Sequence, residues 1–168
     1  MKEVKVYSIL VLLFVVLVSA KAPAPGKSSM LQVKGYVFKD DVKIDDAVVK
    51  LYQNNKMVQM SKTKKSKFEF ILFSDLRYMV EISLDGCVTE RIQISTMEKT
   101  EFAGKYLYEF RVDLMDLKEF EGVDISDLDF PTALIKYNPD EGEYWHDEEY
   151  SNSVKKSMKK LKSEAKKK

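Results

Sequence analysis

The chain has 168 residues, of which 45% are hydrophobic and 33% charged, so it is long enough and apolar enough to build a folded domain with a core. Lysine and arginine number 28 against 27 aspartates and glutamates, and this net charge of +1 favours no particular class of partner. One cysteine and one histidine exclude an internal disulfide, a cysteine-based zinc cluster and a multi-histidine metal site.

The first 20 residues have the composition of a secretory signal peptide. Two lysines precede an unbroken apolar run of ten residues at 9–18, and Ser19 and Ala20 follow it. A membrane anchor is disfavoured because crossing a bilayer takes about 20 apolar residues. We therefore predict cleavage near Ala20 and an extracytoplasmic location, periplasmic or secreted. Residues 21–29 are rich in Pro, Ala, Gly and Ser, and we expect them to form a linker.

Residues 30–115 alternate apolar and polar side chains with a period of two, as half-buried β-strands do. The breaks between alternating stretches contain Asn54-Asn55 and Asp85-Gly86, pairs that tolerate the positive φ of tight hairpin turns. Seven such stretches can be counted, and the longest runs from Tyr106 to Leu114. The pattern predicts an all-β fold, a seven-stranded antiparallel β-sandwich.

Four of these stretches carry the landmarks of a known family. They read VKGYV at 33–37, DDAVVKLY at 45–52, FEF at 68–70 and YMVEISLDGC at 78–87. In this order they resemble the carboxypeptidase regulatory-like domain, a transthyretin-like (prealbumin-like) β-sandwich of Ig-like architecture. The sequence departs from the family pattern at Ser66-Lys67, where glycine is usual, and at Cys87, where an aromatic residue is usual.

The resemblance implies a non-catalytic domain. In carboxypeptidases this domain accompanies a zinc peptidase domain that the present sequence does not contain, and similar stand-alone chains are envelope proteins of Gram-negative bacteria. The transthyretin-like hydrolase of purine breakdown needs several active-site histidines, whereas this chain has one. We therefore predict a non-catalytic structural or protein-interaction module of the bacterial cell envelope, with no enzyme activity, no cofactor and no metal.

Charge is distributed unevenly along the C-terminal third. Residues 113–153 carry a net charge of −11, and residues 154–168 carry +7. Apolar residues such as Leu117 and Phe120 lie within the acidic stretch, which distinguishes it from a disordered acidic tail. We therefore expect residues 116–153 to pack on the sandwich as an acidic extension, with a short added strand at 132–137.

Residues 138–150 (NPDEGEYWHDEEY) combine six carboxylates with the only tryptophan and the only histidine of the chain. Four interpretations remain open: an acidic surface loop pinned by its aromatic residues, an aromatic contact site, a calcium site, and a carboxylate pair for glycoside hydrolysis. The contact site would use Tyr144, Trp145, His146 and Tyr150 against a partner or ligand. A carbohydrate-binding module that stacks a sugar on Tyr144 and Trp145 is the alternative function. His146 has no visible partner that would make it a general base.

Residues 154–168 space Val154, Met158, Leu161 and Ala165 along one helical face, with lysine at most other positions. This segment is expected to form a short basic helix or a disordered tail. Its lysines would be attracted to an anionic membrane surface by about 1 kcal/mol each, or would fold back onto the acidic stretch. The expected partners are an envelope protein or a second copy of the chain, a glycan, or an anionic membrane surface, and no nucleic acid is expected after secretion.

Overall fold

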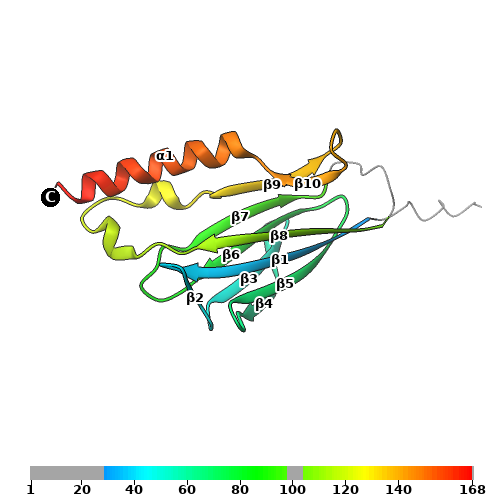
Figure 1. The fold of residues 1–168 in the computed structure, drawn as a ribbon, viewed down its shortest axis with the longest axis horizontal. Helices are drawn as coiled ribbons and strands as arrows, with labels where there is room; N and C mark the ends of the chain where they lie inside the picture. Colours follow the sequence, from blue (N-terminus) through cyan, green and yellow to red (C-terminus); the bar gives the residue numbers. More distant parts are fainter. Residues whose placement is uncertain (1–28, 98–103, 168) are drawn as a thin grey trace, which may run out of the picture.

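The structure is a computed structural model, and it describes residues 29–97 and 104–167. The predicted signal peptide at 1–20 and all but the last residue of the predicted linker lie outside the described residues. The strands form two sheets, and one helix follows them near the C-terminus (Figure 1).

The smaller sheet is built around its central strand β1 (Met30–Lys39). On one side of β1, β5 (Lys67–Phe73) pairs with it antiparallel, and the short strand β2 (Val42–Lys43) pairs antiparallel with the end of β1 through a hairpin. On the other side, β8 (Lys105–Asp113) runs parallel to β1. Gly35 of β1 lies under the ring of Phe68, which occupies the place that a Cβ at position 35 would take. This close approach explains why β1 carries glycine in the middle of a strand.

The larger sheet has six strands in the order β10-β9-β7-β6-β3-β4. Their bounds are β3 Val48–Gln53, β4 Lys56–Lys62, β6 Arg77–Ser83, β7 Glu90–Ser95, β9 Ala133–Asn138 and β10 Glu143–His146. The predicted turn between β3 and β4 is confirmed, because Asn54 and Asn55 adopt φ values of 47° and 65°. The strand expected at 132–137 corresponds to β9.

The two sheets pack face to face, and the period of two places alternate side chains between them. In β6, Tyr78, Val80 and Ile82 are buried, whereas Met79 and Glu81 between them are only partly so. Each fully buried aliphatic side chain of this kind contributes roughly 1.5–3 kcal/mol. The sandwich core therefore comes from the same alternation that predicted the strands.

A mostly-β, two-sheet architecture with a C-terminal helix is confirmed, but seven strands that are all antiparallel are not. The described residues form ten strands, and two of the pairs, β1 with β8 and β7 with β9, are parallel. Parallel neighbours need a crossover rather than a hairpin. Here the chain leaves β7 in the larger sheet, forms β8 in the smaller one and returns to the larger sheet as β9. Residues 116–153 thus supply two strands of the larger sheet in addition to loops.

The basic helix is present as α1 (Glu148–Ala165), which begins before residue 154 and includes part of the acidic stretch. Two short 3-10 turns, η1 (Leu117–Phe120) and η2 (Ser126–Leu128), precede β9. The buried face of α1 and these turns form a second apolar cluster together with Val88, which precedes β7; its buried members are Val88, Phe120, Leu128, Val154 and Met158. Within the described ranges, no helix has the length and apolar character that crossing a membrane requires.

Candidate functional site

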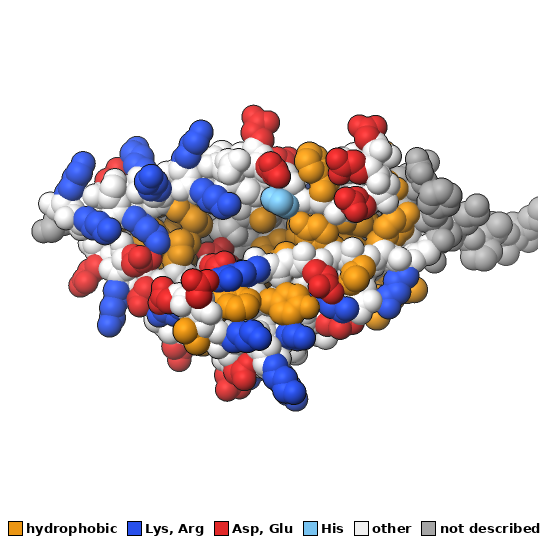
Figure 2. All heavy atoms as spheres, in the orientation of Figure 1, with side chains coloured by type: hydrophobic (Ala, Val, Ile, Leu, Met, Phe, Trp, Pro, Cys, Tyr) orange, Lys and Arg blue, Asp and Glu red, His pale blue; other side chains and the backbone are white. Residues whose placement is uncertain are grey.

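A groove with a volume of about 610 Å³ separates the two apolar clusters of the molecule. One wall is β8, and the opposite wall is formed by β7, β9 and α1. Figure 2 shows hydrophobic side chains along this hollow, with a histidine at its margin. Pockets of roughly 300–1,000 Å³ with mainly apolar walls are typical of sites for small molecules.

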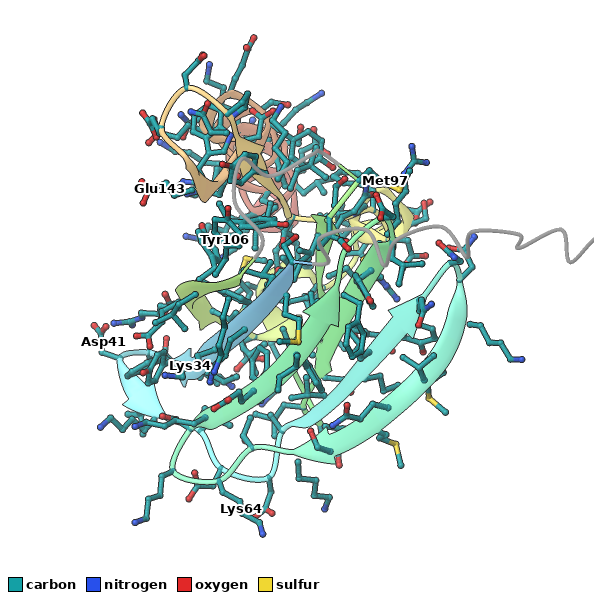
Figure 3. The ribbon with its side chains drawn as sticks, turned by 90° about the vertical axis from the view of Figure 1, so that its right-hand side faces the viewer. Lys34, Asp41, Lys64, Met97, Tyr106 and Glu143 are labelled. Atoms are coloured by element: carbon teal, nitrogen blue, oxygen red, sulfur yellow. The ribbon has the colours of Figure 1, made fainter. Side chains whose placement is uncertain are left out.

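The groove exists because the two sheets differ in width. The smaller sheet ends at β8, whereas the larger one continues beyond β7 through β9 and β10. At one end, three mutually contacting tyrosine rings, Tyr106, Tyr137 and Tyr144, close the space between β8 and these strands, with centroids 5.5–5.7 Å apart. Figure 3 shows Tyr106 between β8 and the strand that carries Glu143. Towards α1 no such ring cluster of the described residues fills the space, and the groove is open.

Glu90 is the most unusual residue in the groove. It begins β7 at an inward position, in line with the buried Ile92 and Ile94, and only 6% of it is exposed. Burial raises the pKa of Glu90, and this effect outweighs the lowering by the Thr132 hydroxyl and by the charge of Arg91. A carboxyl group thus occupies a position where the strand pattern calls for an aliphatic side chain.

The cation next to Glu90 in sequence does not neutralise it. Arg91 points to the other face of β7, where its Nε lies 3.2 Å from Glu81 and its guanidinium 3.1 Å from Asp129. The Thr132 hydroxyl donates a hydrogen bond of 3.1 Å to the backbone carbonyl of Arg91. In the part of the chain that the structure describes, no basic side chain forms an ion pair with Glu90.

Ser151 supplies a second polar group that faces the groove. It lies on the buried face of α1, is 7% exposed, and its Oγ has no hydrogen-bond partner among the described residues. Leaving a buried hydroxyl unpaired costs about 1–3 kcal/mol. A ligand in the groove would pair this oxygen.

The rim of the groove carries the remaining polar side chains. The Tyr108 hydroxyl lies 3.4 Å from Nδ1 of His146, and burial raises the pKa of Tyr108. Arg111 is held by Asp113 and by Asp41, whose carboxylate lies 2.6 Å from its guanidinium. Lys155 is exposed at the α1 side of the opening.

The structure separates the four residues that the sequence singled out for ligand contact. Alternation in β10 places Tyr144 and His146 on one face and Trp145 on the other, and of the first two Tyr144 is buried whereas His146 is exposed. Tyr144 is 5% exposed within the tyrosine cluster, so its ring face is not free to stack a sugar.

Trp145 is 36% exposed under the ammonium of Lys136, 6.0 Å from its ring centre, and it does not line the groove. Tyr150 donates a hydrogen bond of 2.6 Å to the Pro131 carbonyl. Of the four, only His146 lines the groove.

The carboxylates of residues 138–150 do not assemble into a site. None of the six lines the groove, and Asp147 instead caps α1 by accepting a hydrogen bond from the Tyr150 N–H. This bond, followed by the contact with Lys136 at 3.3 Å, lowers the pKa of Asp147. Across residues 29–97 and 104–167, no group of three or more His, Cys, Asp or Glu side chains could hold a metal ion. The calcium and glycosidase interpretations therefore find no supporting geometry there.

Sequence reasoning missed Glu90 and Ser151, although each left a signal. Glu90 interrupts an apolar alternation that continues through Ile92 and Ile94, so a charge on that face is out of place. Ser151 lies three residues before Val154 and extends the apolar stripe of α1 by one turn. A polar residue on an apolar face is the informative exception in both elements.

An apolar surface also lies on the outer face of the smaller sheet. We call it the outer-face patch, and it consists of the exposed side chains Met30, Ile71, Phe73 and Leu107. Strand register places them in adjacent rows of β1, β5 and β8.

No protein-family model matches this chain, and no curated protein sequence is significantly similar to it. Among solved structures, it is similar to catechol 1,2-dioxygenase from Acinetobacter sp. ADP1, inhibited by bound mercury, with 12% identity, a TM-score of 0.41, and coverage of 65% of this chain and 59% of that chain. It is also similar to the dioxygenase domain of a dioxygenase–carbohydrate-binding protein fusion from Streptomyces sp. SirexAA-E, with 14% identity, a TM-score of 0.37, and coverage of 58% and 86%. The match thus spans about three fifths of the length of the first dioxygenase.

These similarities correct one prediction. The sequence led us to predict a non-catalytic envelope module, with a carbohydrate-binding module as the alternative. The solved structures of similar fold are dioxygenases, however. The prediction is therefore wrong in taking this sandwich as a sign of a non-catalytic role. For the same reason, the expectation that the chain is not an enzyme has no positive support. TM-scores of 0.41 and below assign no activity, substrate or metal to this chain.

Proposed function

We propose that this protein binds a small amphipathic molecule in the groove between β8, β9 and α1. One observation carries the proposal: an apolar groove of about 610 Å³ is lined by a buried carboxyl group, that of Glu90, and by a buried hydroxyl that has no partner among the described residues, that of Ser151. A space that only completed the core would be expected to have apolar side chains at both positions.

The apolar side chains that line the groove favour a ligand with an apolar part. Phe110, Ile135 and Met158 line the groove from β8, β9 and α1 respectively. Removing about 150 Å² of ligand apolar surface from water contributes roughly 4 kcal/mol at 25 cal/mol per Å². After the cost of immobilising the ligand, hydrogen bonds to the buried polar groups are needed to reach micromolar affinity.

The test is binding of the neutral apolar dye Nile red, with a groove-filling variant. Ala133→Trp places an indole in the groove, and we expect it to abolish the rise in dye fluorescence. The matched control, Leu107→Trp, adds the same side chain to the outer-face patch and should leave the dye titration unchanged. Equal dye binding by the wild type and Ala133→Trp, with both proteins folded by circular dichroism, would contradict the proposal.

We also propose that the protein acts outside the cytoplasm and that its sandwich is transthyretin-like. The first proposal is supported by the basic, apolar and small-residue pattern of residues 1–20, and the second by the family landmarks between 33 and 87. Expression of the full chain in a bacterial host, followed by N-terminal sequencing of the periplasmic fraction, should give a mature protein that begins after Ala20. Full-length protein retained in the cytoplasm would contradict this. The expected partners, a second chain or an anionic membrane near the lysines of α1, remain predictions.

A further inference from the structure

The charge at the bottom of the groove is the one feature that apolar ligand binding does not explain. Glu90 lies in the sandwich layer beside Ile92 and is 6% exposed. Arg91 is bound to Glu81 and Asp129 on the opposite face of β7. A buried carboxylate without a paired cation is costly, and the cost is relieved by protonation or by a cation.

The rim offers no strong site for an anion. Arg111 already contacts two carboxylates, those of Asp41 and Asp113, so its charge is compensated within the protein. Of the other charged side chains that line the groove, Glu109 is paired with Lys34 at 3.3 Å and Asp113 with Arg111, so Glu90 and the exposed Lys155 are the charges left without an ion pair among the described residues. The buried charge among these two is the carboxylate of Glu90, and it favours a positively charged group over a negatively charged one.

The aromatic wall suits a cation as well. Tyr108 and Phe110 both line the groove from β8, with ring centres 6.0 Å apart. The face of an aromatic ring attracts a nearby cation, more strongly when water is excluded. Ser151 Oγ can accept a further hydrogen bond from an ammonium N–H.

We propose that the ligand is an amphipathic amine whose protonated nitrogen pairs with the carboxylate of Glu90 while its apolar part lies between β8, β9 and α1. This inference rests on the proposed function, and it specifies the chemical class that the groove selects.

The experiment compares three molecules of equal chain length, n-octylamine, n-octanol and n-octanoate, as competitors of Nile red at pH 7 below their micelle concentrations. A hydrogen bond to a charged partner contributes about 1.5–3 kcal/mol, so octylamine should displace the dye at a concentration at least about 10-fold lower than octanol. Octanoate should be the weakest of the three.

Variants assign the preference to a residue. Glu90→Gln should weaken octylamine about 10-fold or more and leave octanol unchanged. The control Glu69→Gln removes a carboxylate from the outer face of the smaller sheet, away from the groove, and should preserve the preference. If Glu90→Gln does not fold, Lys155→Met provides the second test, because removing this rim cation should strengthen octylamine and weaken octanoate.

The outcomes separate the two proposals. Displacement by octylamine and octanol at equal concentrations, or tighter binding of octanoate, overturns the amine inference while leaving the binding groove in place. An unchanged preference in Glu90→Gln also overturns it. If none of the three molecules displaces the dye, or the dye itself does not bind, the proposed function fails as well.

Discussion

Replacing Glu90 with methionine should stabilise the protein, because the carboxyl group occupies a core position of β7. Methionine has a similar length, has no charge and continues the apolar face formed by Ile92 and Ile94. The substitution removes the desolvation cost of a group that is only 6% exposed, and it loses only the interactions with the Thr132 hydroxyl and with the charge of Arg91. Replacing poorly compensated buried charges with apolar groups stabilises proteins by about 1–4 kcal/mol. We expect a gain of about 1–3 kcal/mol at pH 7, or a rise in Tm of roughly 3–10 °C.

The effect should depend on pH with a defined sign. Burial raises the pKa of Glu90 in the folded state above its ordinary value of 4.5. A raised carboxyl pKa contributes stability that is fully present below pH 4.5 and is lost as the pH rises through the folded-state pKa. The advantage of Glu90→Met over the wild type should therefore be large at pH 7 and smaller at pH 4.

Urea unfolding at both pH values, followed by far-UV circular dichroism, measures this difference. Comparing the two proteins at each pH cancels the titration of all other groups. A Glu90→Met protein less stable than the wild type at pH 7, or a difference in unfolding free energy that is the same at pH 4 and pH 7, would refute the reasoning. Glu90 would then be a structural residue rather than one kept for binding.

Two further predictions concern the scaffold. Gly35→Ala should lower the unfolding free energy by about 1–3 kcal/mol, because the new Cβ collides with the Phe68 ring, whereas a Cβ at Gly104 meets no described atom within 4 Å and Gly104→Ala should be close to neutral in the same urea titration. Equal stability of the two variants would contradict the packing. Asp147→Ala should lower the Tm, because the α1 cap is lost. Because the pKa of Asp147 is lowered from 3.8, the stability that it contributes is present above pH 3.8 and is lost as the pH falls further. The Tm values of the wild type and of Asp147→Ala should therefore converge in acid. A difference in Tm that stays constant with pH would show that the cap is not the cause.

The strands were predictable from the sequence because alternation is a local property. In β6, the polarity of each residue indicates which face of the sheet its side chain lies on. The Asn54-Asn55 turn follows from the positive φ that asparagine tolerates. Alternation does not specify which strands are neighbours or in which direction they run. The parallel pairing of β1 with β8 depends on a crossover between the sheets, and no local pattern encodes it.

The candidate site was less predictable because it is assembled from distant segments. Tyr144 and Trp145 are adjacent and conspicuous, yet one is buried among tyrosines and the other lies on the outer face. Glu90 and Ser151 are 61 positions apart and line the same groove only because β7 and α1 both flank it. The composition of residues 138–150 drew attention to a segment whose main contributions are strand β10 and the cap of α1.

The measurement that tests the account most directly is the map of backbone amide shifts on titration of the isotope-labelled protein with n-octylamine. None of the four side chains of the outer-face patch lines the groove, so the map separates specific binding from adsorption to exposed apolar surface. The account predicts the largest changes at Glu90, Ile135 and Ser151, with saturation at one equivalent site. Changes centred on Ile71 and Phe73 with the groove residues unaffected, or no saturable change, would contradict it.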